Sequence, residues 1–587
     1  MGSPTTTGLE GGPLTRSDYD GRVTTTPDDS PAVVTADPGS EWSPDAPEPA
    51  VPDQPTGTAW PPPPAPAPLT NVERLRDGIM ADRLAGWLVT LGITALAFVI
   101  RFVGLAYPNK LNFDETYYAK DAWTLWHHGF EKAWPDGDQT NPSVIAGDVD
   151  IYLDKASFIV HPPVGKWLIG FGEYLFGMNS FGWRFMPLVF GTLLVFMTIR
   201  LARRLSRSTL IGAIAGILLT LDGLAFVMSR IALLDIFQSF FLVAAVAACV
   251  ADRDWYRHRL ADLLDRNGLA DFGGEFGPVV WLRPWRLVAG VMFGLAIGTK
   301  WNSIYVLAVM GLLCVWWDVR ARQLAGADWK GWLALVIDGV PAFIRMVVVA
   351  AIVYVASWAG WLTTTGGWGR DWGEKNPDDP LTIHLGEMWA SFLHYQQDIL
   401  NFHTGDYIND ATHSYAAHPI GWLFMARPLA IDAVSGIEPG VDGCHAADGQ
   451  TCIRAITAMG TPVLWWMAAI ALVVAIIWWI GGRDWRFGVP VLAGLATYVP
   501  WFFAGTRPIF FFYAITIIPF TAIALALVLG LILGPANGRY RRRGAIVVGV
   551  AVALVALNFA WIYPVLTDGI LIYETEYLVR MWIRSWI

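Results

Sequence analysis

Long apolar runs separated by short polar stretches dominate the chain from about residue 84 onward. A membrane-spanning helix needs about 20 predominantly apolar residues, and eleven stretches approach that length. The predicted spans are 84–106, 184–202, 208–227, 231–251, 286–300, 302–318, 342–362, 460–480, 488–504, 509–533 and 545–564. The pattern therefore predicts an all-α polytopic membrane protein with a bundle of about eleven transmembrane helices.

The composition supports this class of protein. Of the 587 residues, 54% are hydrophobic and only 16% are charged, whereas soluble domains carry about a quarter charged residues. Many of the 31 tryptophans stand near the ends of apolar runs, where indole rings favour the lipid–water interface. A net charge of -9 without a basic stripe gives no indication of a nucleic-acid partner.

The chain divides into a tail and a membrane domain. Residues 1–80 are largely rich in Pro, Thr and Asp and include "PPPPAPAP". Because such a composition cannot bury a core, we predict a disordered tail there, followed by a transmembrane domain over 81–587.

Arginine-rich loops set the predicted orientation, since cytoplasmic loops carry an excess of Lys and Arg. "RLARRLSR" at 200–207 and "RYRRRG" at 539–544 are short basic loops, and 481–487 and 251–286 also carry several arginines. With an odd number of spans, all four lie on one side if the N-terminus is cytoplasmic. We therefore predict a cytoplasmic tail.

Two long segments, 107–183 and 363–459, are then external. Apolar residues recur at helical spacing in 384–400, and 119–126 behaves similarly, so both predict amphipathic surface helices. Segment 363–459 shows no strand alternation. Its histidines have no tight metal-ligand spacing, so we predict no metal site and treat them as surface or capping residues. They are His384, His394, His403, His413 and His418.

Ionisable residues gather on the predicted external side, where their burial cost makes them functional candidates. The set is Arg101, Asp114, Glu115, Lys166, Arg184, Arg230, Asp235, Lys300 and Arg507. A carboxylate there can take a proton from a hydroxyl nucleophile. Arginines and lysines on the same side can hold a phosphate and stabilise the leaving charge. Together these groups suit an inverting transfer from a lipid-linked phosphate donor, without an obligatory cofactor.

Structural interpretations of the same residues stay open. Asp114 and Glu115 are also expected as helix N-terminal acids. Asp235 fits a buried ion pair with Arg230 that joins two spans. His161 begins "HPP", a pattern typical of a rigid turn, which would position Lys166 one turn later.

Two cysteines, Cys444 and Cys452, bracket "GCHAADGQTC" in the second external segment. In an oxidising compartment this spacing favours a disulfide over two free thiols.

Seven blocks in fixed order carry a family resemblance. They are "FDETYYAKDAW", "FIVHPPVGKWLIG", "FGWRFMPLVFG", "SRIALLDIF", "GLAIGTKWN", "THSYAAHPIGWLFMARP" and "GTRPIFFFYAITIIPF", with "WIYPVLTDG" after them. Over roughly residues 85–580 the chain resembles protein O-mannosyltransferases of the membrane GT-C superfamily, of the bacterial, actinobacterial type.

The resemblance implies a substrate pair and site roles. The sugar donor would be polyprenyl-phosphate mannose, and the acceptor a Ser or Thr of an exported polypeptide, modified with inversion at the outer face of the cytoplasmic membrane. Because the acceptor would be unfolded, we expect the secretion translocon as a further partner. Asp114 matches the base and Glu115 a second required carboxylate. The residues matched to the donor phosphate are Arg101, Arg184, Lys166 and Arg507. Further candidates without assigned roles are His161, Arg230, Asp235 and Lys300.

Some local features depart from the family pattern. "FFFYAITIIP" replaces an expected "YHY" block, and "MGTP" at 459–462 replaces "GNP". The second external segment is too short for the β-trefoil domain of eukaryotic relatives. Competing functions are transfer of another lipid-linked sugar to a lipid or glycan, transport, or a membrane scaffold. The external charges argue against the last two, because transporters place charges at the midplane within inverted repeats.

Overall fold

The computed structural model describes residues 69–76 and 82–587. Most of the predicted tail therefore lies outside the described residues. Within its last part, however, a short helix forms, α1 (Asn71–Leu75), which corrects the prediction of disorder there. Thr70 and Glu73 form a reciprocal capping box at its start. Arg76 then forms an ion pair with Asp262 at 2.7 Å, which ties the segment to the bundle.

The membrane domain is helical, as predicted. Its principal helices are α2 (Arg83–Phe102), α6 (Ser180–Ser206), α7 (Thr209–Thr220), α9 (Asp235–Arg266), α10 (Pro284–Ile297), α11 (Ser303–Arg322), α14 (Val349–Ser357), α20 (Pro462–Ile480), α21 (Trp485–Tyr498), α22 (Ile518–Leu533) and α23 (Arg541–Leu566). Each predicted span meets one of these helices. In the described chain six helical stretches are long and apolar enough to cross a membrane, and α7, α10 and α22 are shorter apolar helices. The protein is thus a multi-pass membrane protein, and the number eleven stays a prediction.

Some predicted spans are interrupted. The span predicted at 208–227 consists of α7, which ends at Thr220, and a separate α8 (Gly223–Met228). Asp222 caps α8, because its carboxylate accepts a hydrogen bond from the Ala225 N–H at 2.8 Å. The span predicted at 509–533 begins with the 3-10 helix η6 (Phe511–Thr516) before α22 starts.

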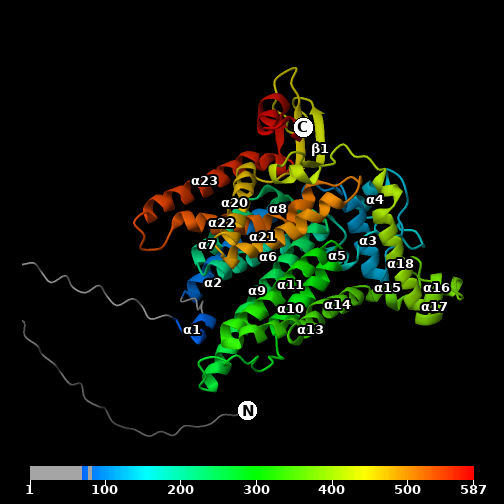
Figure 1. Cartoon of the computed structure of the whole chain (residues 1–587). Helices are drawn as coiled ribbons and strands as arrows, with labels where there is room; N and C mark the ends of the chain where they lie inside the picture. The colour runs from blue at the N-terminus through cyan, green and yellow to red at the C-terminus, as the bar shows by residue number, and fades with distance from the viewer. Residues whose placement is uncertain (1–68, 77–81) are drawn as a thin grey trace, which may run out of the picture. The chain divides into compact units, whose positions relative to one another are not determined.

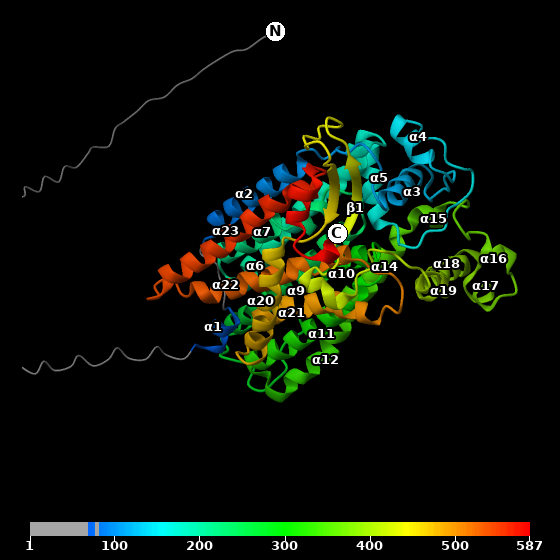
Figure 2. The ribbon, with the colours of Figure 1, turned by 90° about the horizontal axis from the view of Figure 1, so that it is seen from above.

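The first of the two segments predicted to be external, 107–183, contains three helices, α3 (Glu115–His128), α4 (Thr140–Ala146) and α5 (Val164–Phe176). The second contains α16 (Trp372–Lys375), α17 (Pro380–Leu385), α18 (Glu387–Thr404) and α19 (Asp406–Asn409). The amphipathic predictions are confirmed as α3 and α18, with α17 split off at Gly386, whose φ is +80°. Figures 1 and 2 both show α3, α4 and α18 together at one edge, with α22 and α23 at the opposite flank. The short helices that join α11 to the second segment are α12 (Ala334–Ile337), α13 (Gly339–Phe343) and α15 (Ala359–Thr363).

A small antiparallel sheet corrects the expectation of a strand-free external segment. Its order is β1-β2-β3, with strands β1 (Leu429–Ile437), β2 (Cys452–Ala458) and β3 (Ile570–Ile572). The β1–β2 register shifts twice, and β2 is buried almost throughout, so neither strand shows a clean alternation. The favoured disulfide between Cys444 and Cys452 is present and closes the β1–β2 connection.

Helix α9 forms the centre of the bundle. It packs against α6, α10 and α11, and 94% of its most apolar window is buried, compared with 17% for α2 and 33% for α20 and α23. The outer faces of α2, α20 and α23 are therefore available to lipid, whereas α9 contacts protein on all sides. This difference explains why α9 can carry charged side chains at both of its ends.

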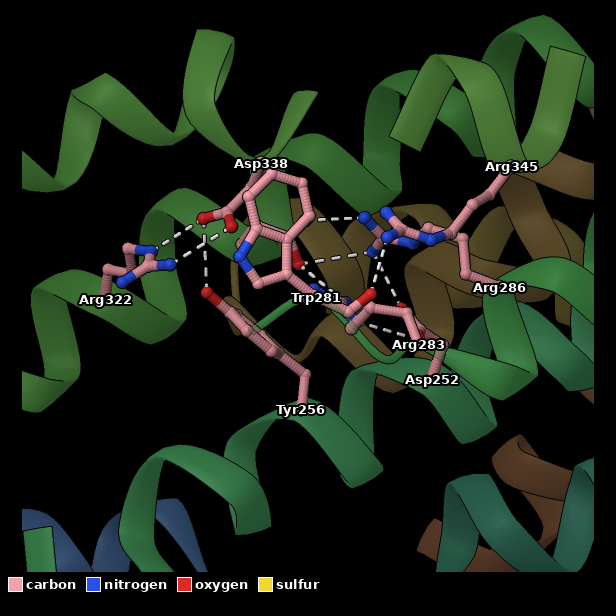
Figure 3. A network of polar contacts seen from close by, with 9 residues as sticks. Asp252, Tyr256, Trp281, Arg283, Arg286, Arg322, Asp338 and Arg345 are labelled. Carbon is pink, nitrogen blue, oxygen red and sulfur yellow. Dashed lines mark hydrogen bonds and ion pairs between the residues drawn. The ribbon is translucent and has the colours of Figure 1, made fainter. Parts of the chain in front are cut away.

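One end of this core is held by a buried network of arginines and aspartates (Figure 3). Arg286 contacts Asp252 and Asp318, both at 2.7 Å, and Arg283 also bridges these two carboxylates. Arg322 and Asp338 form a separate ion pair at 2.6 Å. Because the cations and carboxylates neutralise each other, the network joins α9, α10 and α11 without leaving an isolated buried charge.

We predict that Asp252→Asn destabilises the protein, because Arg283 and Arg286 would then share too little negative charge in a buried setting. The expected cost is on the order of 3 kcal/mol, seen as a lower thermal midpoint of the purified protein. Asp262→Asn is the matched control on the same helix, since its ion pair with Arg76 is solvent-exposed and contributes at most about 1 kcal/mol. Equal midpoints for the two variants would contradict the prediction.

Candidate active site

Several helices end or begin at the same end of the bundle. Helix α2 ends at Phe102, α10 ends at Ile297 and α11 begins at Ser303. Helix α9 begins at this end with Asp235. The loops that link these helix ends, together with α3 and α18, carry most of the predicted site residues.

A buried ion pair between Glu115 and Arg184 fixes the loop between α2 and α3. The Arg184 guanidinium donates to Glu115 through Nε at 2.9 Å and Nη2 at 2.8 Å. It also donates to the carbonyls of Pro108 and Lys110, at 2.9 and 2.8 Å. The Ala232 N–H donates to the Glu115 carboxylate at 3.0 Å. Protein groups thus satisfy the hydrogen-bonding capacity of both Glu115 and Arg184. This arrangement differs from the prediction that Arg184 contacts a phosphate.

Asp114, in contrast, is half-buried and its carboxylate makes no capping hydrogen bond, although it occupies the N-cap position of α3. Its neighbour Phe113 has φ of +50°, a sparsely populated conformation that turns the chain sharply into the helix. Burial raises the pKa of Asp114 to about 6, opposed by the positive charge of Lys300 and reinforced by the negative charge of Asp235. Of the two interpretations drawn from sequence, this geometry favours a proton acceptor over a cap.

Asp235 and Lys300 form a buried ion pair near Asp114. The Lys300 Nζ contacts the two Asp235 oxygens at 2.9 and 2.8 Å. Its ammonium also lies over the Tyr513 ring, 4.8 Å from the centroid. Asp235 therefore pairs with Lys300, which corrects the predicted pair with Arg230.

Three half-buried side chains lie near Lys300: His161, His403 and Arg507. The two imidazoles stack with centroids 5.2 Å apart. His403 Nε2 lies 2.7 Å from the Val160 carbonyl, and its Nδ1 lies 3.2 Å from Arg507 Nη1. A carbonyl only accepts and a guanidinium only donates, so His403 is the neutral Nε2–H tautomer and holds Arg507 in place. Burial lowers the pKa of His403 to about 4, which agrees with this assignment.

Arg507 retains binding capacity. Its Nε is buried and has no hydrogen-bond partner in the described part of the chain. A buried donor without a partner is costly, and a phosphate oxygen would satisfy it. This observation fits the predicted phosphate contact of Arg507.

Two other predicted arginines have structural contacts instead. Arg101 is fully buried and donates to the Ser229 hydroxyl at 3.2 Å and the Leu219 carbonyl at 3.3 Å. Arg230 donates to the carbonyls of Arg101 and Val103, both at 2.6 Å. Their hydrogen bonds tie the end of α2 to the segment before α9, so the structure gives Arg101 no access to a phosphate.

Lys166 is likewise enclosed. Its Nζ lies 2.8 Å from Glu131 and 3.3 Å from Asp121, and its side chain is 1% exposed. Two carboxylates thus neutralise the ammonium, and its contacts join α5 to α3 and to the loop after it. The structure does not bring Lys166 to the phosphate-binding role expected from sequence.

His403 is the functional candidate that sequence reasoning missed. The sequence alone groups it with the surface histidines, because its partners, Val160 and Arg507, are remote in the sequence. The only local signal is its place near the C-terminal end of amphipathic α18. Within the described residues, no group of three or more His, Cys, Asp or Glu side chains is placed to hold a metal ion.

Comparisons with known proteins agree with the sequence resemblance. Residues 92–260 match the model of the dolichyl-phosphate-mannose-protein mannosyltransferase family. Residues 388–586 match the C-terminal four-transmembrane region of protein-O-mannosyltransferase. A polyprenol-phosphate-mannose–protein mannosyltransferase of Mycobacterium tuberculosis is 39% identical over 535 residues, covering 89% of this chain and 95% of that protein. The chain belongs to this family of protein mannosyltransferases.

Other members and one solved structure extend the comparison. Relatives with the same name in Mycolicibacterium smegmatis and Corynebacterium glutamicum are 37% and 34% identical, over 86% and 84% of this chain and 94% and 92% of theirs. The S. cerevisiae Pmt1-Pmt2 complex bound to the sugar donor aligns with a TM-score of 0.62 at 12% identity. It covers 88% of this chain and 94% of that chain. The predicted GT-C type fold is thereby confirmed for this family member.

We predict that His403 remains neutral near pH 6, whereas an exposed histidine is largely charged below about 6.5. Burial and the Arg507 contact both disfavour the imidazolium. Nitrogen-15 NMR of histidine-labelled protein reports the ring charge, with the His403 signal assigned from its loss in His403→Gln. A positively charged His403 ring near pH 6 would overturn the tautomer assignment.

Proposed function

We propose that the protein transfers mannose from polyprenyl-phosphate mannose to Ser or Thr hydroxyls of exported polypeptides. The observation that carries the proposal is one cluster that unites a proton-accepting carboxylate, Asp114, with the cations Lys300 and Arg507. Membership in a family whose curated members are named for this reaction supports the same substrate pair.

Asp114 acts as the general base. Its carboxylate takes the proton of the acceptor hydroxyl as the hydroxyl oxygen bonds to the anomeric carbon of mannose. The bond between that carbon and the phosphate oxygen breaks on the opposite face, so the configuration inverts. The polyprenyl phosphate leaves with the electron pair, and the proton stays on Asp114.

Lys300 and Arg507 stabilise the charge that develops on the leaving phosphate. Arg507 offers its unpartnered Nε, and His403 holds the guanidinium in one orientation. Lys300 is already oriented by Asp235, so little reorganisation is needed as charge appears. A neutral His403 also leaves the positive charge concentrated on these two groups.

Glu115 acts by positioning Asp114 rather than by touching substrate, because Arg184 and two backbone groups surround its carboxylate. We assign Arg184 the same positioning role. His161 is a wall of the site, stacked on His403. No metal or cofactor enters this scheme, since protein cations serve the phosphate.

The predicted sidedness belongs to the proposal as well. We place the N-terminus in the cytoplasm and the Asp114 cluster at the outer face of the cytoplasmic membrane. The basic segments 200–207 and 539–544 support this orientation. An acceptor must reach Asp114 before it folds, so we also propose that the protein works beside the secretion translocon.

Asp114→Asn should lower transfer to a Ser/Thr-rich peptide by on the order of 10³-fold, because an amide cannot accept the hydroxyl proton. The assay uses membranes, labelled polyprenyl-phosphate mannose and EDTA, which also tests the metal-free scheme. Asp136→Asn, at an exposed carboxylate of the same external segment, is the matched control. Equal transfer by both variants excludes Asp114 as the base, and label found only in lipid excludes the peptide acceptor.

The pH profile should follow the ionisation of Asp114. Since its pKa is raised to about 6, the carboxyl is protonated and inactive below that pH and ionised above it. We expect kcat/KM to rise about tenfold per pH unit on the acid side and to level off above about 6. A profile that stays flat down to about pH 4 would show that the base has an ordinary carboxyl pKa.

A further inference from the structure

A second charged site lies at the opposite end of the bundle. A cavity of about 480 Å³ lies between α2, α6, α9 and α10. Five arginines line it: Arg83, Arg200, Arg203, Arg204 and Arg207. Along α9, Asp254 at this cavity and Asp235 at the candidate active site are separated by about 28 Å, at about 1.5 Å per residue. The cavity is therefore separate from the Asp114 cluster.

Among the described residues that line the cavity, positive charges outnumber negative charges. The single carboxylate in its lining, Asp254, is shared by Arg204 at 3.4 Å, Arg207 at 3.2 Å and Arg253 at 3.1 Å. One carboxylate carries one negative charge, so Asp254 cannot compensate both Arg204 and Arg253. Arg203 is satisfied separately, by Asp82 and Thr209. An anion in the cavity would balance the remaining positive charge of Arg200 and Arg204.

Arg200 supplies an unused hydrogen-bond donor. Its Nη1 is buried and lacks a hydrogen-bond partner within the described residues. The guanidinium stacks on the Trp87 ring, with Cζ 3.9 Å from the centroid, which holds it in place. A phosphate oxygen in the cavity would satisfy this buried donor and reduce its desolvation cost.

The surroundings of the cavity identify the source of the phosphate. Trp87, Trp255 and Trp285 also line it, and tryptophan favours the membrane interface. Trp87 continues into an exposed apolar stripe of α2 with Leu84, which is 73% exposed, and Leu88, which is 62% exposed. A lipid whose headgroup occupies the cavity can therefore lay its acyl chain along this stripe, whereas a soluble phosphate gains nothing from it.

We propose that this cavity binds the phosphate headgroup of an anionic phospholipid. The arginines contact the phosphate oxygens, and the α2 stripe contacts the acyl chain. Basic pockets between the ends of transmembrane helices recognise anionic headgroups by this combination of charge and burial. The bound lipid joins α2, α6 and α9 at the end of the bundle away from the Asp114 cluster.

The test uses the purified full-length protein in detergent and native mass spectrometry. Dioleoyl phosphatidylglycerol is titrated against dioleoyl phosphatidylcholine, which has the same chains but no net charge. We expect retention of phosphatidylglycerol at concentrations where phosphatidylcholine is lost. Arg200→Gln with Arg204→Gln should weaken phosphatidylglycerol binding by on the order of tenfold. Arg542→Gln with Arg543→Gln, at exposed arginines in the first turn of α23, should leave it unchanged.

The wild-type lipid comparison decides the proposal even if the double variant fails to fold, and Arg200→Gln alone gives a milder substitution. Equal retention of the two lipids by the wild-type protein overturns the proposal. So does undiminished phosphatidylglycerol binding by a folded double variant, or an equal loss in both double variants. Inorganic phosphate is added as a competitor, and displacement of bound lipid at millimolar phosphate would assign the cavity to soluble anions instead.

Discussion

The buried ion pair between Glu115 and Arg184 is the contact on which the geometry of the site depends. Buried charges are tolerated only when they are paired and hydrogen-bonded. This pair meets that condition through backbone groups of two segments, the loop before α3 and the segment before α9. The loop before α3, the start of α6 and the segment leading into α9 are thereby held together. Asp114 is the residue before Glu115, and Asp235 follows Ala232 by three positions. The Glu115–Arg184 ion pair therefore determines where the carboxylates of both Asp114 and Asp235 lie.

The charged side chains at the Asp114 end of the bundle divide into two groups by their partners. Arg101, Lys166, Arg184 and Arg230 are saturated by protein carbonyls or carboxylates and hold segments together. Asp114 and Arg507 are half-buried and keep unsatisfied capacity. Side chains with unsatisfied hydrogen-bonding capacity keep a fixed geometry only when the saturated residues around them form a rigid support. The Asp235–Lys300 pair shares features of both groups. It is buried like the structural charges, yet it acts electrostatically on Asp114.

The sequence predicts features whose physical cause is local and misses those whose cause is remote. Apolar run lengths locate the helices, and the adjacent acids 114 and 115 mark the site, because both signals lie within a few residues. The roles of the two acids separate only when Arg184 closes on Glu115 from 69 residues away. His403 depends on Val160, 243 residues distant, and the strands on pairings and bulges across the chain. In contrast, helix α1 had a readable local signal, the capping box of Thr70 and Glu73.

The pairing of β3 with β2 also constrains how often the chain crosses the bilayer between them. Strands that share hydrogen bonds must stand on the same side of the membrane, so an even number of crossings separates residues 458 and 570. Four helices, α20 to α23, lie in that interval. Insertion of three of them would leave β3 on the wrong side of the bilayer. The short β2–β3 ladder can thus form only when an even number of these helices has crossed the bilayer. Its hydrogen bonds form only after α23 has entered the lipid.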